Sequence, residues 1–408
     1  MNKVTKKILA FNSNRNAEIV KIKYGFISQD VFRFYRGTCH LFYEDLAKKV
    51  RWKDDTKCCI TGDLHLENFG TYKGDNRVVY FDMNDFDEAL MAPATWEISR
   101  LLTSVYLAGH ILQFSEKLAE ELCHIYTTAY INVLENGKPI VIEKETATGL
   151  LEFFLERVQH RQQKEFIRSR IEKKNGHWKI IVDKEKTLPC MTDEKEKVAV
   201  ALNDWLKKHL PGKKLQVQDV CYRIAGTGSV GIERYAALVY EKAKNRFHLV
   251  DIKEAAPSSL LPYSVYKQPA WQTEADRVVT LQKMVQHVSP AFLHTIYFGN
   301  KSFVVKELQP TQDRMDLALC KGKKNNLSDI LVTMAEVTAS GQLRSGGRQG
   351  SSITDDLLHF AANCEAWKKP LLQYAKKYAK QVVADYNSYK KDFEKGLVVK
   401  PAREAKTS

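Results

Sequence analysis

One block of strand-like sequence lies between two long stretches with helical periodicity. Residues 215–310 contain segments rich in Val, Ile, Tyr and Phe that turn residues separate, a composition typical of antiparallel strands. Residues 1–214 and 311–408 carry mostly helical patterns, with two short apolar strands near Cys58 and Val78. This order predicts an α+β fold with a small antiparallel sheet lobe and a larger helical lobe built from both ends of the chain.

The composition bounds the class of partner. The 408 residues include 63 Lys and Arg against 49 Asp and Glu, which gives a net charge of +14. This excess favours anionic partners such as nucleotides, phosphorylated metabolites, nucleic acid or an acidic surface. Nucleic acid is the least favoured of these, because the sequence contains no RNA-binding signature and no ladder of alternating aromatic and basic residues.

The cysteines and apolar runs bound the compartment. Eight scattered cysteines without a C-x-x-C pair indicate reduced thiols in a chain that does not need disulfides. No apolar run approaches the roughly 20 residues that span a bilayer, and the start of the chain lacks a secretory apolar segment. We therefore expect a cytoplasmic protein without a membrane span, while export by a route that reads no cleavable signal stays open.

A polar loop after the first apolar strand carries residues that suit phosphoryl transfer. In GDLHLENFG, Asp63 can accept the proton of a hydroxyl acceptor and the side-chain carbonyl of Asn68 can ligate Mg²⁺. The next strand ends at Asp82, where a carboxylate could hold the metal against nucleotide phosphates, with Asp85 in reserve. Asp and Asn are also common turn residues. The strands on both sides nevertheless favour a metal site formed by Asn68, Asp82 and Asp85.

A glycine-rich turn marks a second candidate site. Its third glycine leads into a strand, whereas the third glycine of a dinucleotide-binding fold opens a helix. Strand, glycine turn and strand is the arrangement of a loop that folds over ATP phosphates, and an ordinary glycine-rich hairpin is the alternative. The residues expected to contact nucleotide in this turn are Gly226, Thr227, Gly228, Ser229 and Gly231.

Later residues complete the predicted nucleotide site. Lys253 lies in the next apolar strand, where its ammonium could pair with the α- and β-phosphates of ATP. Glu274, at the start of the following helix, could orient this lysine. Glu307 and Leu308 end a strand that runs into a hinge whose backbone could hold adenine. The predicted cofactors are therefore ATP and Mg²⁺.

These segments resemble the protein-kinase-like superfamily in a circularly permuted order, with the catalytic loop before the glycine loop. FYRG, GDLHLENFG, FDMNDFDEAL and RIAGTGSVGIERYAALV are also similar to a large bacterial family that carries a domain-of-unknown-function label. This second resemblance spans most of residues 30–390. Together the two resemblances imply a permuted kinase-like fold of two lobes, and they leave the activity to be argued from the site.

The loop GDLHLEN is more similar to that of aminoglycoside and choline kinases than to that of protein kinases. About a dozen residues separate Asp82 from the helix that begins near Thr95, too few for an activation segment that docks peptides. In those small-molecule kinases an Asp braces the catalytic loop, and here Glu97 takes its place.

We therefore expect an ATP- and Mg²⁺-dependent phosphotransferase that phosphorylates a hydroxyl of a small molecule, with Asp63 as the base. AMP transfer, phosphorylation of a protein, and a non-catalytic nucleotide- or nucleic-acid-binding role are the alternatives. The sequence does not identify the acceptor or the oligomeric state.

Overall fold

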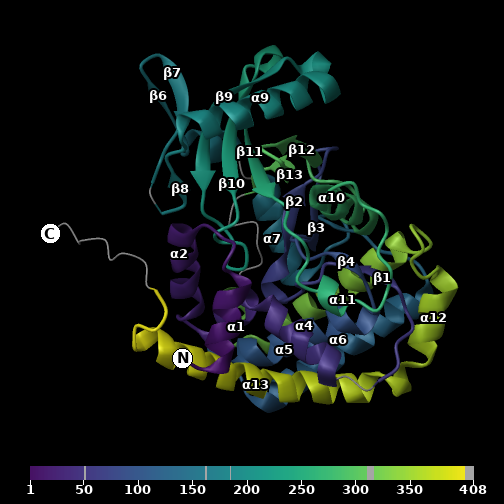
Figure 1. The fold of residues 1–408 in the computed structure, drawn as a ribbon. Helices are drawn as coiled ribbons and strands as arrows, with labels where there is room; N and C mark the ends of the chain where they lie inside the picture. The colour runs from purple at the N-terminus through teal and green to yellow at the C-terminus, as the bar shows by residue number, and fades with distance from the viewer. Residues whose placement is uncertain (50–51, 161–162, 184, 310–316, 400–408) are drawn as a thin grey trace.

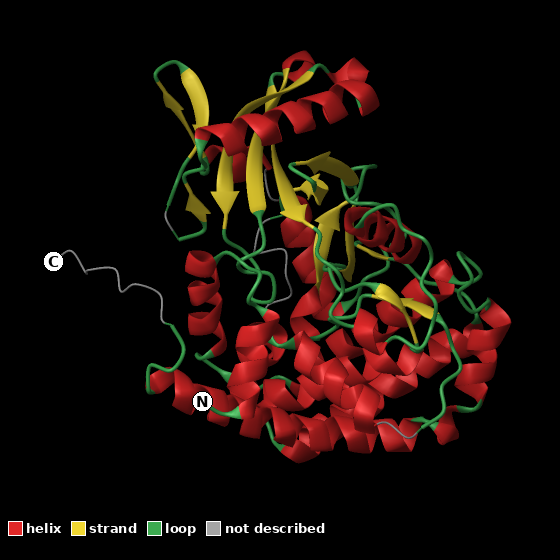
Figure 2. Ribbon diagram, viewed as in Figure 1, coloured by secondary structure: helices red, strands yellow, loops and turns green. Residues whose placement is uncertain are grey.

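The computed structural model describes residues 1–49, 52–160, 163–183, 185–309 and 317–399. A sheet lies at one end of the molecule and a larger group of helices at the other (Figures 1 and 2). Along the chain the helices and strands are α1 (Lys3–Phe11), α2 (Ala17–Ile27), α3 (Val31–Gly37), α4 (Cys39–Lys49), β1 (Cys58–Ile60), β2 (Phe69–Lys73), β3 (Val79–Met83), β4 (Leu90–Ala92), α5 (Ala94–Leu112), α6 (Glu116–Asn136), β5 (Ile142–Glu143), α7 (Gly149–His160), α8 (Gln163–Arg168), β6 (Ile171–Lys174), β7 (His177–Ile180), β8 (Thr187–Leu188), α9 (Thr192–His209), β9 (Leu215–Arg223), β10 (Arg234–Glu241), β11 (Arg246–Glu254), α10 (Glu274–Val285), β12 (His294–Phe298), β13 (Lys301–Glu307), α11 (Lys324–Ser345), α12 (Thr354–Ala362) and α13 (Lys368–Glu394).

The helical lobe confirms the helical patterns on both sides of the sheet sequence. Helix α5 is buried around its whole circumference because α3, α6 and α13 all pack against it. Its apolar side chains continue one core that reaches from Ile8 in α1 to Tyr389 in α13. A helix that is buried on every side occupies this kind of central position. Since Arg100 of α5 contacts Asp63, this packing gives that carboxylate a rigid support.

The sheet lobe is a six-stranded antiparallel sheet in the order β12-β13-β11-β10-β9-β8, which confirms the predicted strand type. Side chains alternate along each strand. On β10, Tyr235 and Ala237 join the core beneath α9, whereas Ala236 lies in a smaller cluster on the opposite face. This opposite face is the one that borders the candidate site. It also carries Asp251 and Lys253 of β11.

Residues 150–214 differ from the mostly helical pattern that their sequence indicates. They include the hairpin β6–β7 and the short strand β8, which extends the sheet beside β9. Helix α9 forms as expected, but its apolar side chains, among them Leu202 and Leu206, pack on the sheet. The hairpin was missed because its strands are largely exposed and charged, so they lack an apolar alternation. The sheet lobe therefore begins before residue 215.

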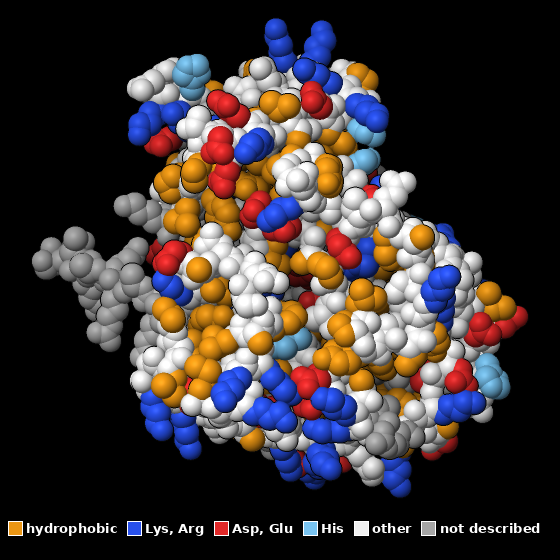
Figure 3. Space-filling view, in the orientation of Figure 1, with side chains coloured by type: hydrophobic (Ala, Val, Ile, Leu, Met, Phe, Trp, Pro, Cys, Tyr) orange, Lys and Arg blue, Asp and Glu red, His pale blue; other side chains and the backbone are white. Residues whose placement is uncertain are grey.

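Part of the positive charge of the chain lies along one edge of the surface. Lys and Arg side chains gather along the edge of the molecule that α13 forms (Figure 3). Some of them pair with neighbouring acids, as Lys376 does with Glu116 and Glu120 at 3.1 and 3.0 Å. None of the described helices is long and apolar enough to cross a membrane.

Candidate active site

Two cavities adjoin between the sheet lobe and the helical lobe. The sheet cavity, of about 570 Å³, lies against the face of the sheet that carries Asp251 and Lys253. The loop cavity, of about 580 Å³, lies between the glycine turn, Asp63 and the N-terminal segment. Four residues line both cavities: Asn68, Asp85, Asp87 and Gly226. The structure therefore brings the predicted catalytic loop and glycine turn, about 160 residues apart in sequence, to one place.

Asp63 is held by an arginine that the sequence analysis overlooked. Oδ1 of Asp63 accepts a hydrogen bond of 2.7 Å from Nε of Arg100, and a second nitrogen of the same guanidinium also contacts it. Burial raises the pKa of Asp63 to about 6, although the attraction of Arg100 opposes this rise. The carboxyl group is thus mostly ionised at neutral pH. The one sequence feature that could have indicated this role is that Arg100 is a single arginine within the apolar run of α5.

The other oxygen of Asp63 faces the glycine turn. A Cβ atom placed on Gly228 would lie 4.0 Å from Oδ2 of Asp63 and 3.3 Å from the carbonyl oxygen of Arg36. A larger residue at position 228 would therefore intrude on the space between the turn and the carboxylate. Asp63 and Gly228 both line the loop cavity, so an acceptor hydroxyl could reach the carboxylate there.

Two close contacts position the backbone before Asp63. Gly62 has φ +78°, and a Cβ on it would lie 2.3 Å from the carbonyl oxygen of Glu88, so only glycine fits. Oε1 of buried Glu97 accepts hydrogen bonds of 2.6 Å from both the backbone N–H and the hydroxyl of Thr61. Glu97 therefore braces this loop from α5.

Of the three predicted metal ligands, two face the cavities. The Nδ2 atom of Asn68 donates to the carbonyl oxygen of Asp63 at 2.7 Å, which leaves Oδ1 as the atom able to bind a cation. Asn68 and Asp85 both lie where the two cavities adjoin.

Asp82 does not lie where its predicted role as a metal ligand requires. Its carboxylate accepts from the backbone of Met83 at 2.8 Å and from Arg344 at 3.2 Å, and it is not among the described residues that line either cavity. The predicted strand ended too early, because β3 continues to Met83 and the loop into the cavities begins at Asn84.

The two remaining predicted metal ligands, Asn68 and Asp85, fit Mg²⁺ only if a bound phosphate completes its coordination. Among the described residues, no group of three or more His, Cys, Asp or Glu side chains is placed to hold a metal ion. Mg²⁺ typically takes one or two carboxylates and completes its shell with water and substrate phosphates. Asn68 and Asp85 supply an amide oxygen and a carboxylate of this kind, so the pair fits a Mg²⁺ ion that arrives with phosphate.

The predicted pair between Lys253 and Glu274 is not formed. Lys253 makes an ion pair with Asp87, and Glu274 accepts from Arg277 at 2.6 Å. Arg277 also donates at 2.9 Å to the carbonyl oxygens of Asp87 and Ala256. Arg277, one helical turn beyond Glu274, therefore makes the contact between α10 and the loop that contains Asp87. Glu274 is outside the described lining of both cavities, whereas Lys253 lines the sheet cavity.

The glycine turn lines the loop cavity and is fastened by the N-terminal segment. Its predicted residues Thr227, Gly228, Ser229 and Gly231 line this cavity, and Gly226 lines both. Arg15 donates to the carbonyl oxygens of Gly228 and Val230 at 2.7 and 2.8 Å, and Lys23 donates to that of Gly228 at 2.8 Å. Burial holds the pKa of Lys23 well below its usual value. No sequence signal linked positions more than 200 residues apart.

The predicted hinge has both of its backbone donors engaged. The N–H of Glu307 donates to the carbonyl oxygen of Ala291 at 2.7 Å, and that of Leu308 to Leu249 at 2.8 Å. The Glu307 carboxylate contacts Arg77 at 3.2 Å, while the Leu308 side chain lines the sheet cavity. A base in the sheet cavity could therefore not use either N–H group.

Comparison with known proteins identifies a family without a described activity. A family model described as "Uncharacterized protein conserved in bacteria (DUF2252)" matches residues 15–392, so the chain belongs to this family. No curated protein and no solved structure matches the chain. The geometry of the site is therefore the basis on which a function can be inferred.

Proposed function

We propose that this member of the DUF2252 family is a Mg²⁺- and ATP-dependent transferase in which Asp63 activates a hydroxyl group of an acceptor. The observation that carries this proposal is the meeting of Asp63 with the glycine turn: Gly228 lies against Oδ2, and both line the loop cavity. Asn68 and Asp85, at the junction of the cavities, would hold Mg²⁺, which would neutralise phosphate charge during transfer.

In this proposal the protein itself accepts a proton from the acceptor hydroxyl and holds the accepting carboxylate in place. The acceptor oxygen attacks a phosphorus atom of ATP, the bond from that phosphorus to the leaving oxygen breaks, and the hydroxyl proton passes to Oδ2 of Asp63. Arg100 holds Oδ1, so the carboxylate keeps one orientation. With its pKa near 6, Asp63 is ionised at neutral pH and can accept this proton. The loop cavity, of about 580 Å³, has the volume of a small-molecule site.

Two transfers use the same residues. Attack on the γ-phosphorus gives a phosphorylated acceptor and ADP, as the resemblance to aminoglycoside and choline kinases implies. Attack on the α-phosphorus gives an adenylylated acceptor and pyrophosphate. The second transfer is favoured by one observation, the concentration of positive side chains in the sheet cavity.

The test compares Asp63→Asn with the wild-type protein and with Asp204→Asn, a matched change at an exposed position of α9. Calorimetry should find Mg²⁺-ATP binding in all three proteins. Acceptor screens with ATP labelled at the α- or γ-phosphate should find transfer in wild type and Asp204→Asn, and a loss of about 10²–10⁴-fold in Asp63→Asn. Equal transfer by Asp63→Asn, or no Mg²⁺-ATP binding by the wild-type protein, would contradict the proposal.

A further inference from the structure

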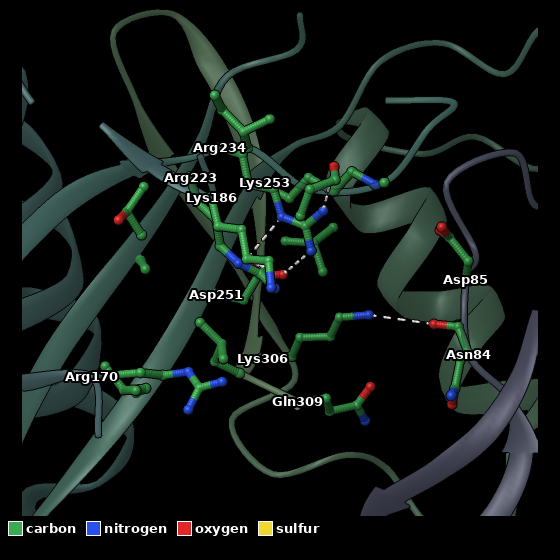
Figure 4. Close-up of a pocket in the computed structure, with 18 of the residues that line it drawn as sticks. Asn84, Asp85, Arg170, Lys186, Arg223, Arg234, Asp251, Lys253, Lys306 and Gln309 are labelled. Atoms are coloured by element: carbon green, nitrogen blue, oxygen red, sulfur yellow. Dashed lines mark hydrogen bonds and ion pairs between the residues drawn. The ribbon is translucent and has the colours of Figure 1, made fainter. Parts of the chain in front are cut away.

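The face of the sheet that borders the sheet cavity carries a cluster of charged side chains beside its apolar ones. Asp251 precedes Lys253 by two residues on β11, and Arg234 on β10 lies opposite Lys253 in register. Arg234 and Arg223 both pair with the Asp251 carboxylate, at 2.6 and 2.7 Å, and Figure 4 shows the three side chains together in the cavity. Ala236 and Leu249 add apolar surface to the same face, so it is the charged groups, and not a lack of apolar surface, that distinguish this cavity.

Positive charge exceeds negative charge in this cavity. Of the described residues that line it, six are Lys or Arg and four are Asp. Asp251 is shared by two arginines, and Asp87 is paired with Lys253. Within the described part of the chain, Lys306 donates only to the carbonyl oxygen of Asn84, at 3.4 Å, and burial lowers its pKa. Among the described residues no carboxylate is in contact with Lys306, so its ammonium can donate to an anion and the cavity is suited to one.

A second wall adds to this charge. Lys186 and Arg170 belong to the segment that includes α8 and the β6–β7 hairpin, and Figure 4 places both side chains around the cavity, facing the sheet residues. Cations thus converge on this cavity from two walls. Arg and Lys donors that converge in this way bind phosphate oxygens well.

The loop cavity has the opposite balance. Among the described residues that line it, seven are Asp or Glu and four are Lys or Arg. A triphosphate placed there would face carboxylates, whereas a neutral base and a hydroxyl acceptor would not be repelled. The two backbone N–H groups of the hinge that could have bound a base in the sheet cavity are already engaged, by Ala291 and Leu249.

We infer that the β- and γ-phosphates of the nucleotide enter the sheet cavity and that its base lies toward the loop cavity. This inference rests on the proposed function, since it takes ATP as the ligand. It places the α-phosphate at the junction of the cavities, beside Asp63. The acceptor oxygen then bonds to the α-phosphorus, the bond to the bridging oxygen of the β-phosphate breaks, Asp63 takes the proton, and pyrophosphate leaves. Under this inference the proposed transferase is an adenylyltransferase, which transfers AMP to the acceptor.

The test uses inorganic tripolyphosphate with Mg²⁺, and adenosine, as separate probes of the full chain. Lys306→Met and Lys186→Met each remove one cation of the cavity from a different wall, and Lys242→Met, at an exposed site of the same lobe, is the matched control. Calorimetry should find that wild type and Lys242→Met bind tripolyphosphate equally. Each cavity variant should bind it about 10- to 100-fold more weakly, the effect of losing a charge-assisted hydrogen bond. Adenosine binding should not change.

Other results separate the two proposals. Unchanged tripolyphosphate affinity in both variants, or a loss of adenosine affinity instead, would overturn the inference while Mg²⁺-ATP binding and γ-label transfer left the proposed function standing. Failure of the wild-type protein to bind either Mg²⁺-ATP or tripolyphosphate would remove both. Because the two lysines lie on separate walls, misfolding of one variant leaves the other to decide.

Discussion

Asp82→Asn should stabilise the protein at neutral pH, although it removes one partner of a buried ion pair. Two effects compete in this variant. Arg344 loses its carboxylate, but it keeps hydrogen bonds of 2.6 and 2.9 Å to the carbonyl oxygens of Val285 and Ile140. Against this, burial raises the pKa of Asp82 from its ordinary value of 3.8 to about 6, even with Arg344 beside it. The desolvation of the carboxylate therefore outweighs its attraction to Arg344.

The sign and size follow from this pKa. A carboxyl group whose pKa is higher in the folded state contributes stability below about pH 4, and this contribution is lost as the pH rises through 6. A rise from 3.8 to about 6 corresponds to about 3 kcal/mol of the free energy of unfolding. The amide that replaces the carboxyl group in Asp82→Asn does not titrate. The variant should therefore exceed wild type by up to about 3 kcal/mol at pH 8, and the gap should close between pH 6 and pH 4.

Urea unfolding followed by tryptophan fluorescence at pH 4, 6 and 8 measures this gap, and Asp204→Asn should show none. The Mg²⁺ dependence of ATP binding should stay as in wild type, because Asp82 faces Arg344 and not the cavities. A variant that is less stable than wild type at pH 8, or a gap that does not depend on pH, would refute the reasoning.

Two further outcomes concern the cavity loops. Asp85→Asn should raise the Mg²⁺ concentration needed for ATP binding by about tenfold or more, because a carboxylate ligand becomes neutral; a Mg²⁺ titration by calorimetry checks this, and the same requirement in Asp85→Asn and Asp82→Asn would remove Asp85 from the metal site. Arg15→Met should speed amide hydrogen exchange in residues 226–231 by about 10- to 100-fold, since two hydrogen bonds to the glycine turn are lost. Lys21→Met, which removes only a pair with exposed Glu18, is the control, and equal exchange in both variants would show that Arg15 does not fasten the turn.

Local patterns were enough to predict the elements that hold the site. The alternation of β10 and β11 follows from their sequences, so Lys253 could be placed facing the space beneath the glycine turn, and it lines the sheet cavity there. The helix that begins at Glu274 was also predictable from its period. What these patterns could not give is the pairing of charges across the chain. Lys253 pairs with Asp87. Glu274 pairs with Arg277, because it is Arg277 of α10 that reaches the backbone of Asp87.

The N-terminal contacts were beyond the sequence for a different reason. Arg15 and Lys23 lie on or beside short helices that give no sign of their partner, and the glycine turn is over 200 residues away. Neither a motif nor a period encodes such a contact, since any basic side chain at the right place could make it. The charge of the sheet cavity was hidden in the same way, because Arg223 and Arg234 stand at the ends of two strands and converge only when these pair.

Asp63 and Asp82 show why the orientation of a carboxylate must decide whether it acts as a base. Burial raises the pKa of both Asp63 and Asp82 to about 6, and each has an arginine beside it. A perturbed pKa therefore does not distinguish a base from a structural group. The difference is that Asp82 directs both oxygens at protein donors, whereas Asp63 keeps Oδ2 toward Gly228 and the loop cavity. Only a carboxylate with an oxygen open to the cavity can take a proton from an acceptor.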